Sequence, residues 1–151
     1  MKTLDTTIDI DATPAKVWET LIDFPSHEQW NPFFARIEGE PRVGQSITIT
    51  ARKPDGSGGM SFTPTILDAE PAKLLRWRGK LFIKGLFDGE HTFQLVDLGN
   101  GQTRLNHGEK FSGILIPVMG KVLFDTEKGF MAFNQALAEE VTNRLSTEPS
   151  S

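Results

Sequence analysis

The chain opens with a short alternating strand and closes with a long amphipathic helix, and only strand-like segments lie between these two ends. Leu4, Ile8 and Ile10 share one parity of the opening segment, which predicts a strand buried on one face. Thr13 and Pro14 then match the N-cap and the first residue of a helix. A curved sheet that grips one long helix usually encloses a cavity, so ligand binding is the first function to consider.

Bulk properties narrow the class of protein. A chain of 151 residues is long enough for one domain with a real core, and we expect that domain over residues 1–146, with a frayed tail at 147–151. The absence of cysteine excludes disulfides and suits a reducing cytoplasm. A net charge of -4 argues against a nucleic-acid partner. No apolar run approaches the roughly 20 residues that span a bilayer, so we expect a cytoplasmic protein without membrane insertion.

The middle of the chain has the alternation and turn punctuation of an antiparallel sheet. A single helical turn is expected around residues 26–30, and the segment Lys-Pro-Asp-Gly-Ser-Gly-Gly has turn chemistry throughout. The predicted strands after the first helix cover residues 34–38, 46–52, 60–69, 74–78, 91–97 and 103–111.

One hairpin can be interpreted in register. The segment Leu-Gly-Asn-Gly-Gln joins two alternating runs, and a three-residue loop with Gly101 in the left-handed conformation is a favoured form. In that register Phe93 faces His107 and His91 faces Glu109. These pairs share a face with apolar neighbours, so three polar side chains are expected on the apolar side of the sheet.

His91, His107 and Glu109 are the candidates for chemistry. A buried carboxyl group opposite an imidazole needs hydrogen-bond partners, because an unpaired one costs several kcal/mol. One interpretation is a polar end to a cavity that orients a ligand or moves a proton. The other is a satisfied structural pair near the edge of the sheet. No histidine spacing supports a metal site, and no motif for a serine nucleophile occurs.

Aromatic side chains are the second group of candidates. The chain has 11 phenylalanines and 3 tryptophans but no tyrosine, so most of its aromatic surface carries no hydroxyl group. Trp18 and Trp77 are expected in the core. A place in the core and a place in a pocket wall or mouth remain equally open for Trp30, Phe33, Phe82 and Phe87.

The closing segment becomes helical in period beyond residue 113. Glu127 and Asn134 fall on its apolar stripe, so they either face a partly hydrated cavity or lie at its rim. Gly129 costs this helix about 1 kcal/mol relative to alanine, which close approach of a strand or bulky ligand would explain, as would chance drift. A helix over about 118–144 is predicted by Leu123, Phe130, Leu137, Val141 and Leu145.

Four segments resemble a known superfamily. They are IDATPAKVWETLIDFPSHEQWNPF, RIEGEPRVGQSITI, LLRWRG and GQTRLNHGEKFSGIL. In this order they are similar to the START-like helix-grip superfamily, and within it to the polyketide cyclase/dehydrase-like (SRPBCC) proteins of bacteria. The resemblance implies an α+β helix-grip fold, in which a curved seven-stranded antiparallel sheet surrounds a long C-terminal helix, with two short helices after the first strand.

The same resemblance implies a ligand site in a deep apolar cavity between the sheet and the long helix. Similar proteins bind lipids, polyketides, hormones or other apolar molecules, and some cyclise aromatic polyketides. In the cyclases, polar cavity residues position the ligand and assist proton transfer, and the positions here that could do so are His91, His107, Glu109 and Asn134, with His91, His107 and Glu109 as the catalytic candidates. The predicted ligand-binding residues are Trp30, Phe33, Trp77, Phe87, Phe93, His107, Glu109, Phe130 and Asn134.

Three functions follow from these observations. The first is binding of a small apolar ligand, such as a lipid, a polyketide or an aromatic compound. The second is a cyclase/dehydrase-like enzyme that uses polar cavity residues for proton transfer. The third is an interaction module like the branch that activates a chaperone ATPase, which would use an exposed surface. Neither a cofactor nor a metal is expected, and no oligomeric state is predicted.

Overall fold

A computed structural model describes residues 2–52, 58–80, 88–113 and 120–147 of the chain. The elements are β1 (Lys2–Ile10), α1 (Pro14–Leu21), the 3-10 turn η1 (Phe24–Ser26), α2 (His27–Trp30), β2 (Phe34–Glu38), β3 (Thr48–Arg52), β4 (Gly58–Phe62), β5 (Thr65–Glu70), β6 (Leu74–Lys80), β7 (Asp88–Gly99), β8 (Gln102–Ser112) and α3 (Gly120–Thr147). Within the described ranges a large sheet has the strand order β1-β8-β7-β6-β5 and a smaller sheet the order β2-β3-β4, and all strand pairs are antiparallel.

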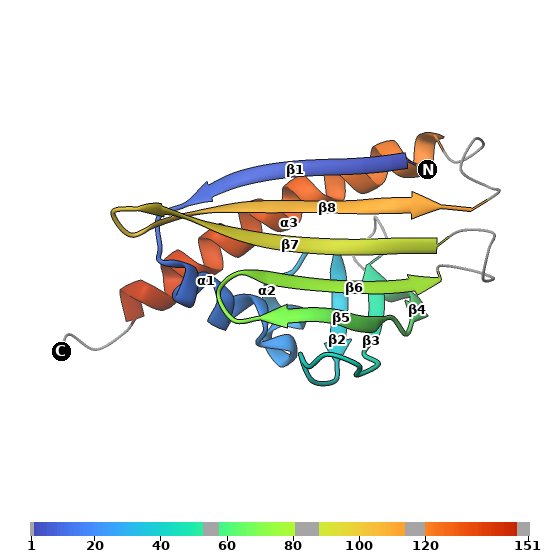
Figure 1. Ribbon diagram of the computed structural model, residues 1–151, viewed down its shortest axis with the longest axis horizontal. Helices are drawn as coiled ribbons and strands as arrows, with labels where there is room; N and C mark the ends of the chain where they lie inside the picture. Colours follow the sequence, from blue (N-terminus) through green and yellow to red (C-terminus); the bar gives the residue numbers. More distant parts are fainter. Residues whose placement is uncertain (1, 53–57, 81–87, 114–119, 148–151) are drawn as a thin grey trace.

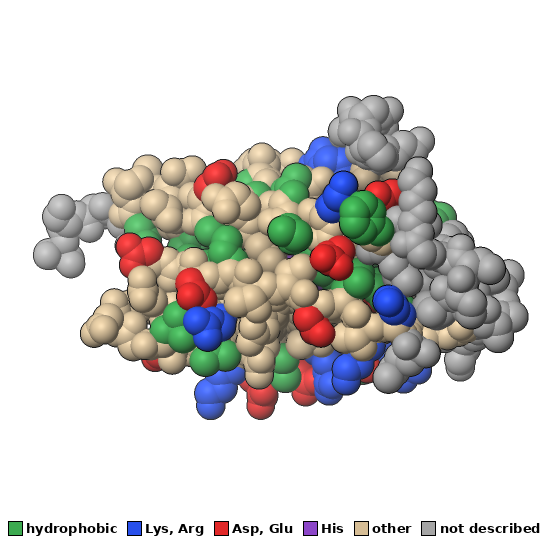
Figure 2. Space-filling view, turned by 90° about the horizontal axis from the view of Figure 1, so that it is seen from above, with side chains coloured by type: hydrophobic (Ala, Val, Ile, Leu, Met, Phe, Trp, Pro, Cys, Tyr) green, Lys and Arg blue, Asp and Glu red, His purple; other side chains and the backbone are tan. Residues whose placement is uncertain are grey.

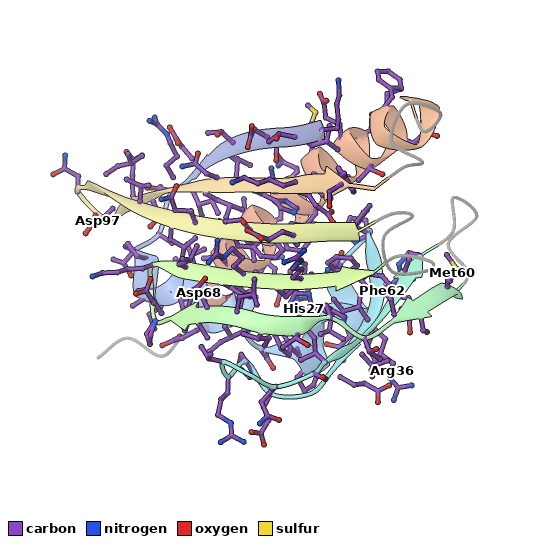
Figure 3. All side chains as sticks on the ribbon, turned by 45° about the vertical axis from the view of Figure 1, so that its right-hand side comes forward. His27, Arg36, Met60, Phe62, Asp68 and Asp97 are labelled. Atoms are coloured by element: carbon purple, nitrogen blue, oxygen red, sulfur yellow. The ribbon has the colours of Figure 1, made fainter. Side chains whose placement is uncertain are left out.

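The long helix α3 lies along one face of the larger sheet, and the strands of the smaller sheet run steeply across those of the larger one (Figure 1). The expected α+β helix-grip fold is therefore confirmed. β4 forms an edge of the smaller sheet, where Met60 lies exposed at the periphery of the molecule (Figure 3). No helix in the described ranges is both long enough and apolar enough to cross a membrane.

The predicted strand over 60–69 is wrong, because the structure divides it into β4 and β5, which belong to different sheets. Pro64 lies at the break, and proline cannot donate a ladder hydrogen bond. Its carbonyl group instead accepts a hydrogen bond from Ile47 N at 3.0 Å, and a bridge between Ser46 and Thr65 links the two sheets. The division explains why the described part of the chain has eight strands rather than seven.

The ends of the helices follow local chemistry. Pro14 is the first residue of α1, and the Thr13 side chain accepts a hydrogen bond from Lys16 N at 3.4 Å, as the cap predicts. α3 begins at Gly120 and ends at Thr147. Thr147 is therefore helical rather than part of a tail, and residues 148–151 lie outside the described residues.

The core lies between α3 and the larger sheet. Trp18 and Trp77 belong to it, as predicted, and Phe130 and Phe133 of α3 are fully buried. Glu127 is exposed, which fits a position at the rim of the stripe rather than one facing a cavity.

The β7–β8 hairpin has the predicted register, with Phe93 opposite His107 and His91 opposite Glu109. Its loop differs from the predicted form. Asn100 and Gly101, with φ of 55° and 76°, make a two-residue turn between Gly99 and Gln102. A bulge between Asp97 and Gly99 then restores the register that a three-residue loop would have given.

Candidate functional site

A chain of five polar side chains crosses the interior between the larger sheet and α3. From Glu109 on β8 it passes to His91 on β7 at 3.3 Å, and from His91 to His107 on β8 at 2.6 Å, between the two Nε2 atoms. His107 Nδ1 lies 2.7 Å from Asn134 Oδ1 on α3, and Asn134 Nδ2 donates to Thr6 Oγ1 on β1 at 2.8 Å. We call these five residues the polar chain. It joins the sheet to the helix by hydrogen bonds inside the core.

Aromatic rings enclose the two imidazoles of the polar chain. His107 stacks on Phe130, with centroids 4.2 Å apart and planes at 19°, and on Phe93 at 4.5 Å. His91 lies 5.0 Å from Trp77. Both imidazoles are almost fully buried, so water is kept from the centre of the chain.

This environment favours the uncharged form of every titratable member. Burial lowers the pKa of His91 to about 3. Burial, and then the neighbouring His91, hold the pKa of His107 well below its usual value. Burial raises the pKa of Glu109 to about 8. Although His91 and Glu109 are close enough for an ion pair, desolvation outweighs their attraction and both stay neutral near pH 7.

Glu109 lies at the end of the larger sheet where β7 begins and β8 ends. Its side chain is 10% exposed, more than the other members on β7 and β8. Gly89 makes room for it, because a Cβ atom at Gly89 would clash with Oε2 of Glu109. Both ends of the polar chain, Thr6 and Glu109, are therefore partly buried, whereas the three members between them are buried.

We expect Gly89→Ala to move the Glu109 carboxyl group away from His91. The added methyl group takes the space of Oε2, and the end of a glutamate side chain can swing aside toward water. The pKa of Glu109 should then fall toward its ordinary value. A carboxyl ¹³C NMR titration measures this, with Thr92→Ala, on the outer side of the same strand, as the control. A Glu109 titration unchanged by Gly89→Ala would contradict the close fit.

The buried groups also predict how stability depends on pH. The folded state keeps the proton of Glu109 up to about pH 8, whereas the unfolded state loses it near 4.5, so stability falls as pH rises through this window. His27, with a pKa of about 4, and the two histidines of the polar chain act in the opposite sense below 6.5. Three histidines outnumber one carboxyl group, so stability should be greatest near pH 6.5.

Between pH 6.5 and 8 the loss should be about 1–2 kcal/mol. Glu109→Gln should remove it, because an amide does not titrate. Urea unfolding at several pH values measures both effects. Equal slopes for the two proteins above pH 6.5 would show that Glu109 is not the group responsible.

A second buried polar cluster lies at α2. His27 Nε2 donates to Leu21 O at 2.8 Å, and His27 Nδ1 accepts from Asn31 Nδ2 at 3.0 Å. Asn31 Oδ1 accepts from the backbone N–H groups of Phe33 and Phe34. His27 lies inside the molecule (Figure 3). Each polar atom is used to hold α2 against β2, which gives this cluster a structural role.

The structure brings most of the predicted site residues together. Phe33 reaches the group through Phe130, with ring centroids 5.3 Å apart, and it also explains Gly129, where a Cβ atom would lie 2.5 Å from the Phe33 ring. Trp30 reaches the group through Phe133, with ring centroids 5.6 Å apart, and donates its ring N–H group to Ser26 Oγ. Phe87 and Phe82 lie outside the described residues. The residues that meet around the polar chain are Trp77, His91, Phe93, His107, Glu109, Phe130 and Asn134.

Two residues of the site escaped prediction. Thr6 completes the polar chain, and its place on the parity of Leu4 and Ile8 was a usable signal of an inward-facing hydroxyl group. Phe133 contacts His107 at 4.9 Å, and its position three residues after Phe130 on the helix was a second signal.

Three surface hollows are lined by described residues. They lie at the start of α1 beside the β5–β6 turn, on the outer face of the larger sheet, where Glu109 is one of the lining residues, and beside α2 and β2. Within the described ranges no group of three or more histidine and acidic side chains could hold a metal ion. The polar chain is therefore the candidate functional site of the part that the structure describes.

Comparison with known proteins identifies the family to which the chain belongs. The model of the family described as polyketide cyclase / dehydrase and lipid transport matches residues 1–146. The chain belongs to this family. No curated protein matches it.

Solved structures share the fold of this family member at low sequence identity. The Zhui aromatase/cyclase from Streptomyces sp. R1128 is 19% identical, with a TM-score of 0.75 and 95% of each chain covered. A protein from Mesorhizobium loti is 22% identical, with a TM-score of 0.74, over 98% of this chain and 100% of that one. A START superfamily protein from Mycobacterium smegmatis is 18% identical, with a TM-score of 0.71, over 93% and 97%.

Proposed function

We propose that this protein binds a small apolar molecule between the larger sheet and α3, with Glu109 as its polar contact. The observation that carries the proposal is the polar chain itself. Its two imidazoles are enclosed by aromatic rings, and the chain ends in a carboxyl group whose side chain is 10% exposed. An apolar wall with a few convergent polar groups is the usual composition of a small-molecule site.

The family supports the same class of ligand, since its description names polyketides and lipid transport. The buried aromatic residues Trp77, Phe93 and Phe130 would form the apolar wall of the site. Glu109 would fix the orientation of the ligand. The proposed location is the cytoplasm, which the lack of cysteine supports.

Native mass spectrometry of freshly purified protein, followed by denaturing extraction, tests the proposal. A retained lipid or aromatic molecule at a defined mass would support it and identify the ligand class. A clean apo mass, together with no binding of naphthalene or a fatty alcohol by calorimetry, would contradict it.

Proton transfer is the second candidate function. It is favoured by the contact between Glu109 and His91, because a carboxyl group with a pKa raised to about 8 can act as a general acid near neutral pH. With a cyclisable polyketide as substrate, Glu109→Gln should lower kcat by about 100-fold or more if Glu109 transfers the proton. Unchanged turnover in that variant would remove Glu109 from a catalytic role.

A chaperone-type interaction surface receives less support. Exposed apolar side chains of α3 include Phe124 and Met131. On the face shown in Figure 2, however, hydrophobic side chains of the described residues lie scattered among charged ones. Single exposed apolar residues are normal on a protein surface.

A further inference from the structure

The hydrogen bonds of the polar chain can run in only one direction. Thr6 has a single hydroxyl proton, and it donates that proton to the backbone carbonyl group of His107 at 2.7 Å. A carbonyl oxygen only accepts. Thr6 must therefore accept from Asn134, which presents its NH₂ group to Thr6 and its oxygen to His107. The backbone carbonyl group of His107 therefore determines the donor and the acceptor in each hydrogen bond from Thr6 to Glu109.

The direction of these hydrogen bonds fixes which ring nitrogen carries the proton in His107 and in His91. The oxygen of Asn134 accepts, so His107 carries its proton on Nδ1. A neutral imidazole has one N–H group, so Nε2 of His107 is bare and must accept from Nε2 of His91 at 2.6 Å. The single proton of His91 is thereby used, and Nδ1 of His91 is left as a bare acceptor that faces Glu109.

The junction between His91 and Glu109 needs one proton. Nδ1 of His91 lies 3.3 Å from Oε1 of Glu109. An ionised Glu109 would place two acceptors face to face, and an ion pair would place two charges in a buried site. A carboxylic acid avoids both costs, because its O–H group donates to Nδ1 and its other oxygen, Oε2, keeps its lone pairs.

We propose that the Glu109 end of the polar chain is a neutral acceptor site: Glu109 donates its proton to His91, and its Oε2 atom accepts a hydrogen bond from the hydroxyl group of an uncharged apolar ligand. The site would then favour phenols, enols and alcohols over carboxylates. The preference for a hydroxyl group rests on the proposed function, whereas the proton state of Glu109 stands on the hydrogen bonds and on the burial of the two imidazoles.

The surrounding charges agree with a neutral ligand. On β7, His91 is the titratable group in contact with Glu109. Lys2 of β1 and Glu127 and Lys128 of α3 are exposed, and Lys128 lies over the Phe124 ring instead. Among the described residues, no cation contacts Glu109 that would balance the charge of a buried carboxylate ligand.

The proton state is tested in the free protein. Long-range ¹H–¹⁵N NMR spectra should show the Nδ1–H tautomer for His107 and the Nε2–H tautomer for His91. The Glu109 carboxyl carbon should have the chemical shift of the acid at pH 6.5. An ionised Glu109, or the opposite tautomer at either histidine, would overturn the proposed direction whatever the protein binds.

The ligand preference is tested by calorimetry with four matched probes. We expect 2-naphthol to bind about 3- to 10-fold more tightly than naphthalene or 2-methoxynaphthalene, which lack the hydroxyl donor. We expect 2-naphthoate to bind at least 10-fold more weakly than 2-naphthol, because its charge would be buried without a partner. Equal binding of all four would overturn the inference but leave the apolar site intact. Failure of all four would overturn the proposed function and this preference together.

Three variants test whether Glu109 causes the preference for a ligand with a hydroxyl group. Glu109→Leu should abolish the discrimination between 2-naphthol and 2-methoxynaphthalene. Glu109→Gln should restore it, because an amide also donates to Nδ1 of His91 and keeps an acceptor oxygen. Gly89→Ala provides a second route, since it displaces the carboxyl group without changing it, and it should abolish the same discrimination. Discrimination that survives both Glu109→Leu and Gly89→Ala would overturn the assignment.

Discussion

Replacement of Phe130 by alanine is expected to lower the free energy of unfolding by about 3–5 kcal/mol. Its ring is fully buried and stacks on His107 at 4.2 Å, with His91 at 4.9 Å and Phe33 at 5.3 Å on other sides. The surrounding rings are tied to the sheet and α2, so they can fill the space only in part. The change should also weaken binding of an apolar probe such as naphthalene.

Urea unfolding and calorimetry measure the two effects of Phe130→Ala. For a domain of about 150 residues, the expected loss corresponds to a fall in Tm of roughly 6–20 °C. Met131→Ala is the matched control, because Met131 is the next residue of α3 and is 58% exposed. A loss below about 1 kcal/mol, or an affinity for naphthalene equal to that of the control, would contradict a site lined by this face of α3.

Replacement of Asn134 by leucine is the second large effect that we expect. Leucine branches at Cγ as asparagine does, so the change removes the hydrogen-bonding groups while keeping the branched shape of the side chain. It leaves Nδ1–H of His107 without an acceptor and removes the donor to Thr6, inside a region from which water is excluded. Each buried unsatisfied group costs about 1–3 kcal/mol, so we expect a loss of about 2–4 kcal/mol.

A second consequence of Asn134→Leu separates this account from a purely structural one. With the anchor removed, the His107 tautomer is no longer imposed, and the ¹⁵N shifts of His91 and His107 should both change. Gln135→Leu, at an exposed position of the same helix turn, should change neither stability nor these shifts. Histidine spectra identical to those of the unmodified protein would show that Asn134 does not set the direction of the polar chain.

The two cross-strand pairs at the centre of the site could be predicted from the sequence, because they depend only on the register of the β7–β8 hairpin. Alternation and turn chemistry place His91 opposite Glu109 and Phe93 opposite His107, and the structure has both pairs. The contacts that the polar chain makes between the sheet and α3 could not be predicted from the sequence. The meeting of Asn134 with Thr6 joins residues 128 positions apart, and no local pattern specifies which turn of a helix packs over which strand.

One error has an identifiable physical cause. Residues 60–69 have strand-like residues on both sides of Pro64, and only the missing N–H group of Pro64 shows where the chain leaves one sheet for the other. Glu127 and Asn134 share a seven-residue spacing, which leaves their side chains only about 20° apart around the helix. The spacing alone therefore does not show that Asn134 is buried while Glu127 is exposed. The cost of Gly129 was noticed in the sequence, and its reason, the ring of Phe33, needed the fold.

The central claim is that an apolar ligand binds between the larger sheet and α3, beside Glu109. Intermolecular NOEs between 2-naphthol and the ¹³C-labelled protein test it most directly. We expect NOEs from the naphthol ring to Phe93 and Phe130, and a change in the Glu109 carboxyl shift on binding. NOEs confined to the outer-face residue Thr92 or to the exposed Met131, or no NOE at a saturating concentration of 2-naphthol, would contradict the claim.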